Sequence, residues 1–79
     1  MNRNEVKCRY LTIESHIGSR TTYGIAAVDA ALGEAAILES YVDVTCDEVQ
    51  MENFTALCNN EGLDLLHLRD AVEDWIAEL

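Results

Sequence analysis

Three cysteines and two histidines are the first residues to consider for catalysis or metal binding. Cys46 is the strongest candidate nucleophile, because we expect it in the first turn of a helix, where the helix dipole lowers the pKa of a thiol. Asp47 and Glu48 follow it directly, and neighbouring carboxylates disfavour the thiolate. A catalytic cysteine also needs a base within hydrogen-bond reach, and the sequence indicates none. We therefore interpret Cys46 as a partly buried, inert thiol.

A zinc site could combine the thiols of Cys46 and Cys58 with the imidazole of His67. The spacing does not favour such a site, since the chain has neither a C-x-x-C nor an H-x-x-x-H pattern. Cys58 also falls on the apolar face of a predicted helix, whereas His67 falls on a polar face near Asp70 and Asp74. We interpret His67 as a solvated side chain, and we predict no metal and no cofactor.

Glu73 and Asp74 could be interpreted as an acid–base pair. Consecutive residues of a helix diverge by about 100°, so these two carboxylates do not face a common substrate. The sequence also lacks a phosphate-binding loop and a nucleophile beside a base. Among the possible functions, an enzyme is therefore the least favoured, and we expect a protein without catalytic activity.

The net charge argues against a nucleic-acid partner. The chain has 79 residues, a formal net charge of −10 and a sequence pI of about 4.2, so phosphate backbones are repelled. Ten carboxylates lie between Asp43 and Leu79, against the single basic residue Arg69. A helix-turn-helix interpretation of this region fails for the same reason, because its second helix would meet DNA with acids.

The basic residues gather at the other end of the chain. Residues 1–23 contain four basic residues and two glutamates, so we expect a polarised surface; the basic residues are Arg3, Lys7, Arg9 and Arg20. The first ten residues lack the apolar stretch of a secretory signal, and no segment approaches the roughly 20 apolar residues that span a bilayer. Three cysteines without paired spacing are typical of reduced thiols. We predict a cytoplasmic protein that does not contact a membrane.

The carboxy-terminal half shows the period of two amphipathic helices. The first begins at a capping box formed by Thr45 and Glu48, and Gly62 is placed to end it in a left-handed conformation. Asp64 then caps the second helix. The apolar stripes are Met51, Phe54, Leu57 and Cys58 in the first helix, and Leu65, Leu68, Val72, Trp75, Ile76 and Leu79 in the second. The pattern predicts a helical hairpin.

The first half of the chain is rich in β-branched and aromatic residues. Three strands are predicted, over Val6–Ser15, Thr21–Asp29 and about Ala35–Val44, with turns at His16–Arg20 and Ala30–Glu34. An alternative stays open, because the alanine-rich segment Ile25–Ser40 would form a helix on propensity alone. We favour the strands, because Gly33 interrupts that segment and a β-branched, aromatic run follows it.

These elements predict one α+β domain over residues 1–79, in which a three-stranded antiparallel meander precedes a two-helix hairpin that packs on one sheet face (βββαα). Hydrophobic residues make up 49% of the chain, as expected for a globular protein. The segment Tyr23–Ile25 and, above all, the sequence from Cys58 through His67–Trp75 resemble a family of short uncharacterised proteins from Firmicutes, mainly Clostridia. The resemblance implies a fold and a bacterial host, and no function.

Apolar residues occur on both faces of the first and third predicted strands. Cys8 and Tyr10 lie opposite Leu11 and Ile13, and Ile37 and Tyr41 lie opposite Leu38 and Val42. The helices cover one face, so we expect another copy of the chain to cover the second. The predicted interaction surface comprises Cys8, Tyr10, Ile37, Tyr41 and Leu66, and the predicted function is a protein-interaction module that forms a homodimer. The alternative is an acidic regulator that binds a basic protein surface, in the extreme case by mimicking nucleic-acid charge.

Overall fold

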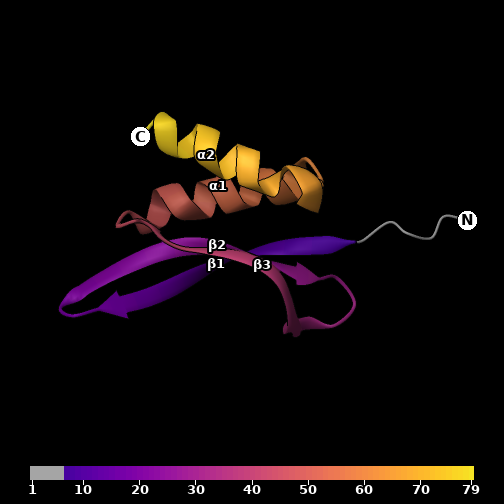
Figure 1. Cartoon of the computed structure of the whole chain (residues 1–79), viewed down its shortest axis with the longest axis horizontal. Helices are drawn as coiled ribbons and strands as arrows, with labels where there is room; N and C mark the ends of the chain where they lie inside the picture. Colours follow the sequence, from indigo (N-terminus) through magenta and orange to yellow (C-terminus); the bar gives the residue numbers. More distant parts are fainter. Residues whose placement is uncertain (1–6) are drawn as a thin grey trace, which may run out of the picture.

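A computed structural model describes residues 7–79; the predicted strand start at Val6 and the basic residue Arg3 lie outside the described residues. The chain forms a three-stranded antiparallel meander followed by two helices, so the predicted α+β fold is confirmed (Figure 1). The elements are β1 (Cys8–Ile17), β2 (Arg20–Asp29), β3 (Gly33–Thr45), α1 (Glu48–Asn60), the short 3-10 helix η1 (Leu65–His67) and α2 (Leu68–Ala77). Both helices lie on one side of the sheet, and α1 contacts it (Figure 1).

The alanine-rich segment is strand rather than helix, because it occupies the centre of the sheet. β2 lies between β1 and β3, and its residues Ile25 to Val28 are buried on both faces of the sheet. Ala27 packs in the core beneath the helices, and Ala26 lies on the opposite face near Ile37 of β3. Tertiary packing thereby overrides the helical propensity of alanine.

The connection between β2 and β3 is set by a side-chain cap and a glycine. The carboxylate of Asp29 accepts the backbone N–H groups of Ala31 and Leu32, at 2.8 and 3.0 Å. Gly33 then adopts a φ of 64°, a conformation that a side chain disfavours. The predicted turn at Ala30–Glu34 therefore overlaps the observed one, although β3 already begins at Gly33.

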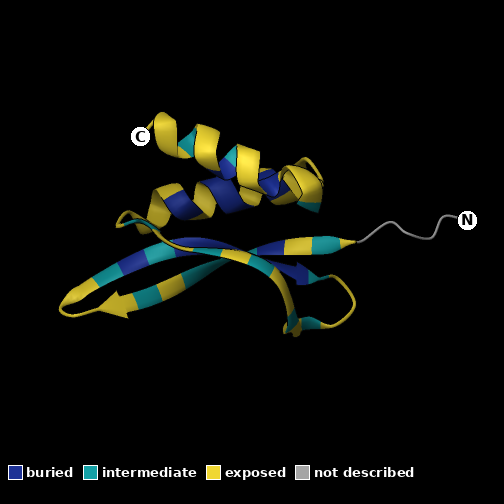
Figure 2. Cartoon of the chain, viewed as in Figure 1, coloured by how far each residue is buried: buried dark blue, intermediate teal, exposed yellow. Residues whose placement is uncertain are grey.

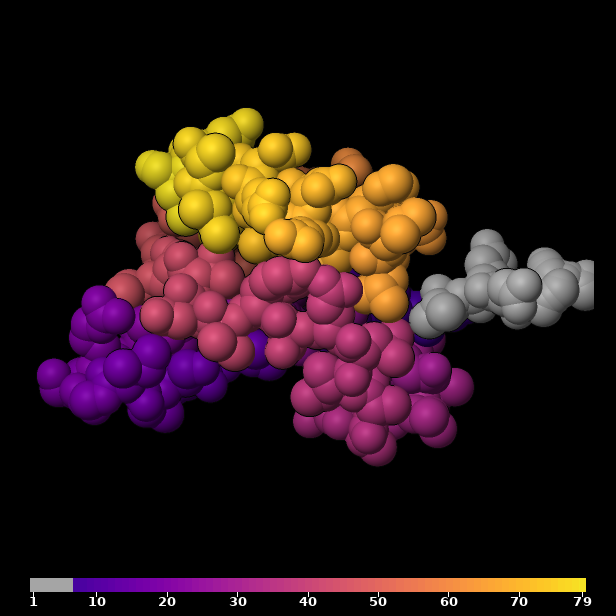
Figure 3. All heavy atoms as spheres, in the orientation of Figure 1, coloured from indigo at the N-terminus to yellow at the C-terminus, as the bar shows by residue number. Residues whose placement is uncertain are grey.

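β3 is bent by three irregularities in its pairing with β2. The register shifts between Tyr23 and Ile25, between Ala27 and Val28, and between Val28 and Asp29. Each shift places extra residues in β3, and bulges of this kind bend a strand and increase its twist. The bent beginning of β3 and the hairpin before it protrude on the side away from the helices (Figures 1 and 3).

Helix α1 begins two residues later than the capping box predicts. Thr45 ends β3, and its hydroxyl accepts the N–H of Asp47 at 3.1 Å. Asp47 is the N-cap instead, and its carboxylate accepts the N–H of Gln50 at 3.0 Å. The predicted capping box is therefore wrong. A carboxylate at this position still satisfies a free amide and interacts favourably with the positive end of the helix dipole.

Gly62 ends α1 as predicted, with a φ of 61°. The N–H of Gly62 donates to the carbonyl of Asn59, and the N–H of Leu63 donates to the carbonyl of Cys58, which is the Schellman pattern. The prediction that Asp64 caps the second helix is wrong, because the N-cap of α2 is His67. Asp64 precedes the 3-10 turn η1, and its side chain makes no capping hydrogen bond.

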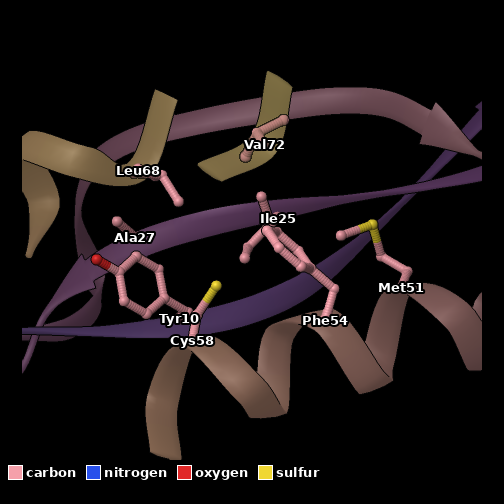
Figure 4. Close-up of a cluster of buried hydrophobic side chains, with 8 residues drawn as sticks. All are labelled: Tyr10, Ile25, Ala27, Met51, Phe54, Cys58, Leu68 and Val72. Carbon is pink, nitrogen blue, oxygen red and sulfur yellow. The ribbon is translucent and has the colours of Figure 1, made fainter. Parts of the chain in front are cut away.

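The hydrophobic core lies between the sheet and the two helices (Figures 2 and 4). Its buried members are Tyr10, Ile25 and Ala27 from the sheet, Met51, Phe54 and Cys58 from α1, and Leu68 and Val72 from α2. The rings of Phe54 and Trp75 stack with their centroids 4.7 Å apart, which joins the two helices. Every core residue predicted for α1 is buried except Leu57, which is 52% exposed.

One buried hydroxyl has no hydrogen-bond partner among the described residues, that of Thr22. An unpaired buried polar group costs roughly 1–3 kcal/mol. We expect Thr22→Val to raise the free energy of unfolding by about 1 kcal/mol, measured by urea denaturation. Thr55→Val is the matched control, because the buried hydroxyl of Thr55 contacts both Thr12 and the carbonyl of Met51. A loss of stability in both variants would contradict the prediction.

Candidate interaction surfaces

The sheet face opposite the helices, here called the outer face, is apolar and only partly covered. Leu11 and Ile13 of β1, Ala26 and Val28 of β2 and Ile37 of β3 line a hollow of about 210 Å³ there, together with Thr12 and Glu34. The bent start of β3 brings Glu34 and Ile37 towards β1. Ala26 and Val28 are thereby buried within one chain, whereas Ile37 remains 60% exposed.

The five residues predicted as an interaction surface do not form one surface. Tyr10 is 2% exposed and belongs to the core, which corrects its assignment, and Cys8 packs beside it. Tyr41 is half-buried against the same core, and its phenol donates to the carboxylate of Glu39. Only Ile37 and Leu66 are exposed.

Ile37 and Tyr41 also lie on opposite faces of the sheet, although the sequence alternation places them together. Ile37 pairs with Val28 and Tyr41 pairs with Ile25, and these partners are three residues apart in β2. The shift between Ala27 and Val28 accounts for the change of face. Of the two, only Ile37 contributes to the outer face.

Tyr10 joins the sheet to the turn between the helices. Its phenol donates a 2.6 Å hydrogen bond to the carbonyl of Leu63 and accepts one from the thiol of Cys8. Burial, followed by the hydrogen bond with Cys8, raises the pKa of Tyr10 well above its usual value. The phenol therefore stays protonated and keeps its bond to the helical turn, so Tyr10 has a structural role.

Asn59 closes part of the free edge of β1. Its side-chain oxygen accepts the N–H of Tyr10 at 2.8 Å, and its side-chain amide donates to the carbonyl of Tyr10 at 2.9 Å. The side-chain amide thereby takes the place of a neighbouring strand at that residue. Asn59 lies outside the apolar stripe that the sequence predicts for α1, so this role was not predicted. Its neighbour Cys58 on the apolar stripe was the only signal that the sheet edge lies close by.

The residues considered for catalysis are not brought together. Cys46 is exposed and precedes the N-cap Asp47, so it is neither partly buried nor inside the first turn of α1 as expected. Cys58 is buried, and burial raises the pKa of its thiol to about 11, with Glu61 adding to the effect. His67 is exposed. Within residues 7–79, no group of three His, Cys, Asp or Glu could hold a metal ion.

The helical layer carries most of the charge of the molecule. Residues 46–79 contain nine carboxylates against the single basic residue Arg69, a formal net charge of −8. Arg69 forms an exposed pair with Glu73 at 3.3 Å. Residues 7–45 contain three basic residues and five carboxylates, so the sheet layer is much closer to neutral. The negative charge is therefore concentrated in the helical layer, as predicted.

A second hollow lies at one end of the helical layer, between α1 and α2. Its volume is about 350 Å³, and it is lined by Gln50, Asn53, Phe54, Leu57, Trp75, Glu78 and Leu79. We call it the helix groove. Leu57 and Leu79 are 52% and 57% exposed, so these two apolar side chains of the groove are open to solvent.

Comparison with known proteins identifies a family and no function. No helix within the described residues is long and apolar enough to cross a membrane. No curated protein and no solved structure matches the chain. The model of one family, described as a family of unknown function (DUF6514), matches residues 1–78. The chain therefore belongs to the DUF6514 family of unknown function.

Proposed function

We propose that this protein is a cytoplasmic, non-catalytic interaction module that forms a homodimer through the outer face of its sheet. The observation that carries the proposal is the apolar hollow around Ile37, which no helix of residues 7–79 covers. Sheets that expose one apolar face commonly bury it against a second layer. A second copy supplies that layer without a further gene product, and a twofold dimer is the commonest symmetric assembly.

The charges of the outer face suit a second copy. Arg9 alternates onto this face with Leu11 and Ile13, and Glu34 lines the hollow. In a twofold contact each copy presents the same patch, so Arg9 of one copy can approach Glu34 of the other. Such a patch is complementary to itself, which favours self-association over an uncharged partner.

The acidic helices also favour this geometry. Packed sheets lie about 10 Å apart, and in a sheet-to-sheet dimer the two helical layers occupy opposite ends of the assembly. Their separation then exceeds the Debye length of about 8 Å at physiological ionic strength. Contact through the helices would instead bring two layers of charge −8 together. Repulsion therefore directs association to the sheet.

The strand edges are poorer candidates than the outer face. Asn59 occupies the edge of β1 at Tyr10, and the register of β3 is broken by bulges. Bulges and charged residues on an edge strand impede pairing with another chain.

Ile37→Glu is expected to weaken the dimer about a hundredfold, because it places a carboxylate in an apolar contact. The measurement is sedimentation equilibrium of the full chain from about 1 to about 200 µM, a range that brackets micromolar dissociation constants. Leu66→Glu is the matched control, since Leu66 is 84% exposed on the helical side and the change of charge is the same. A monomeric unmodified protein, or equal effects of the two substitutions, would overturn the proposal.

A second candidate is an acidic regulator that binds a basic protein surface. The net charge of −8 over residues 46–79 favours it, and Arg69 supplies the single compensating pair of that layer. Binding of this kind weakens steeply with salt. An affinity for an oligolysine peptide that does not change between about 50 and about 300 mM salt would contradict this candidate.

A further inference from the structure

We infer that the helix groove is a docking site for an amphipathic helical segment of another protein, with leucine-like residues on one face and lysine or arginine beside them. Its floor is apolar. Phe54 is 6% exposed and stacks on Trp75, so the two rings join the middle of α1 to the last turns of α2. Leu57 and Leu79 extend this floor to the surface. Amphipathic helices bind grooves of this kind through their apolar residues.

The charges around the groove select a basic occupant. Glu78 lines the groove, and Asp74 lies one turn before it on α2. Glu61 lies one turn after Leu57 at the end of α1. None of the described residues that line the groove is basic. Cationic side chains on the partner would therefore find carboxylates at the groove margin.

The end of α2 adds a second reason for a cation. The last turn of α2 has no basic residue, and its C-cap is Glu78. The carboxyl end of a helix carries a partial negative charge that favours Lys or Arg. Here a carboxylate stands where a cation is favoured, so the charge of the helix end is uncompensated. A partner lysine or arginine next to Glu78 would interact with both.

A second copy of the chain is the wrong occupant for the helix groove. The helical layer of a second copy has a net charge of −8, which repels the same layer in the first. The outer face and the helix groove lie on opposite sides of the sheet, since α1 and α2 cover the other face (Figure 1). The two contacts are therefore separable, and this inference does not depend on the proposed dimer.

The test uses a fluorescent amphipathic peptide of about 16 leucine and lysine residues, which forms a helix of about 24 Å. Its binding to the full chain is followed by fluorescence anisotropy. We expect a micromolar dissociation constant that rises with salt. A peptide of the same composition with leucine and lysine scrambled, and an oligolysine peptide, are expected to bind at least about tenfold more weakly, because they cannot bury an apolar face.

Leu57→Gln is expected to weaken binding about tenfold, and Glu78→Gln about threefold. The matched controls are Val49→Gln and Glu52→Gln, two exposed residues of α1 that do not line the groove. Urea denaturation of each variant separates loss of binding from loss of folding. Equal binding of the oligolysine peptide, equal effects of a variant and its control, or no binding would each overturn the inference. Ile37→Glu leaves binding unchanged if the two surfaces are independent.

Discussion

Gly24→Ala is expected to lower the free energy of unfolding by about 3 kcal/mol or more, because β3 leaves no room for a side chain at this position. A Cβ atom on Gly24 would overlap the carbonyl oxygen of Tyr41 and lie 2.9 Å from the Cα of Val42. Both neighbours are backbone atoms, so no rotamer change can relieve the overlap. Native domains have a total stability of only about 5–15 kcal/mol, so a substantial part of it would be lost.

The measurement is urea denaturation followed by the fluorescence of Trp75, the only tryptophan. Gly18→Ala is the control. Gly18 has a φ of 63°, and a Cβ atom added there would meet no other atom within 4 Å, so its replacement costs only backbone strain, about 1 kcal/mol. If Gly24→Ala were no more costly than Gly18→Ala, the close approach of the β3 backbone to Gly24 would be refuted.

Asn59→Asp is expected to lower the free energy of unfolding by about 2–3 kcal/mol at neutral pH. The substitution removes the amide that donates to the carbonyl of Tyr10 and places a carboxylate against that carbonyl. Protonation restores a donor, so folding raises the pKa of the new carboxyl. The stability that the protonated form contributes is present at low pH and is lost as the pH rises through the pKa of the folded state. Relative to the unmodified protein, the variant therefore recovers stability towards about pH 4.

Asn60→Asp is the control for this experiment. Asn60 is exposed at the end of α1, and the substitution brings the same charge to the neighbouring position without touching β1. Stability is compared by urea denaturation at pH 7 and near pH 4. Equal losses for the two variants at pH 7, or no relative recovery of Asn59→Asp at low pH, would show that Asn59 does not hold the edge of β1.

The order and type of the elements could be predicted from the sequence because local patterns determine them. The apolar stripe of α2, which places Leu68 and Val72 in the core, has the helical period. Gly62 ends α1 because glycine readily adopts the left-handed conformation found there. Gly33 and the β-branched run after it favoured strands over a helix for Ile25–Ser40, and the structure confirms the strands. In each case, neighbouring residues carry the information.

The details of the sheet could not be predicted, because they depend on contacts between distant residues. The bulges of β3 lie at three places along its pairing with β2, and the one between Ala27 and Val28 puts Ile37 and Tyr41 on different faces. The alternation of apolar and polar residues in a sequence does not show where a bulge inserts an extra residue. The alternation of the first strand placed Tyr10 on one face of the sheet, but it could not show that the helices cover that face. Tyr10 was therefore assigned to the interaction surface.

The capping residue of α1 shows a limit of short motifs. Thr45 and Glu48 match a capping box, yet β3 continues through Thr45 and the cap moves to Asp47. Both residues can cap a helix, and only the length of the preceding strand decides between them. That length is set by the pairing of Thr45 with Tyr23, which is a tertiary contact.

Methyl-group NMR spectra of the full chain, recorded at about 10 and about 500 µM, test the location of self-association most directly, since this range spans micromolar dissociation constants. We predict that the methyl signals of Ile13 and Ile37 move with concentration, whereas those of Leu66 and Ile76 on the helical side stay in place. Spectra that do not change with concentration, or changes centred on Ile76, would contradict a dimer formed through the outer face of the sheet.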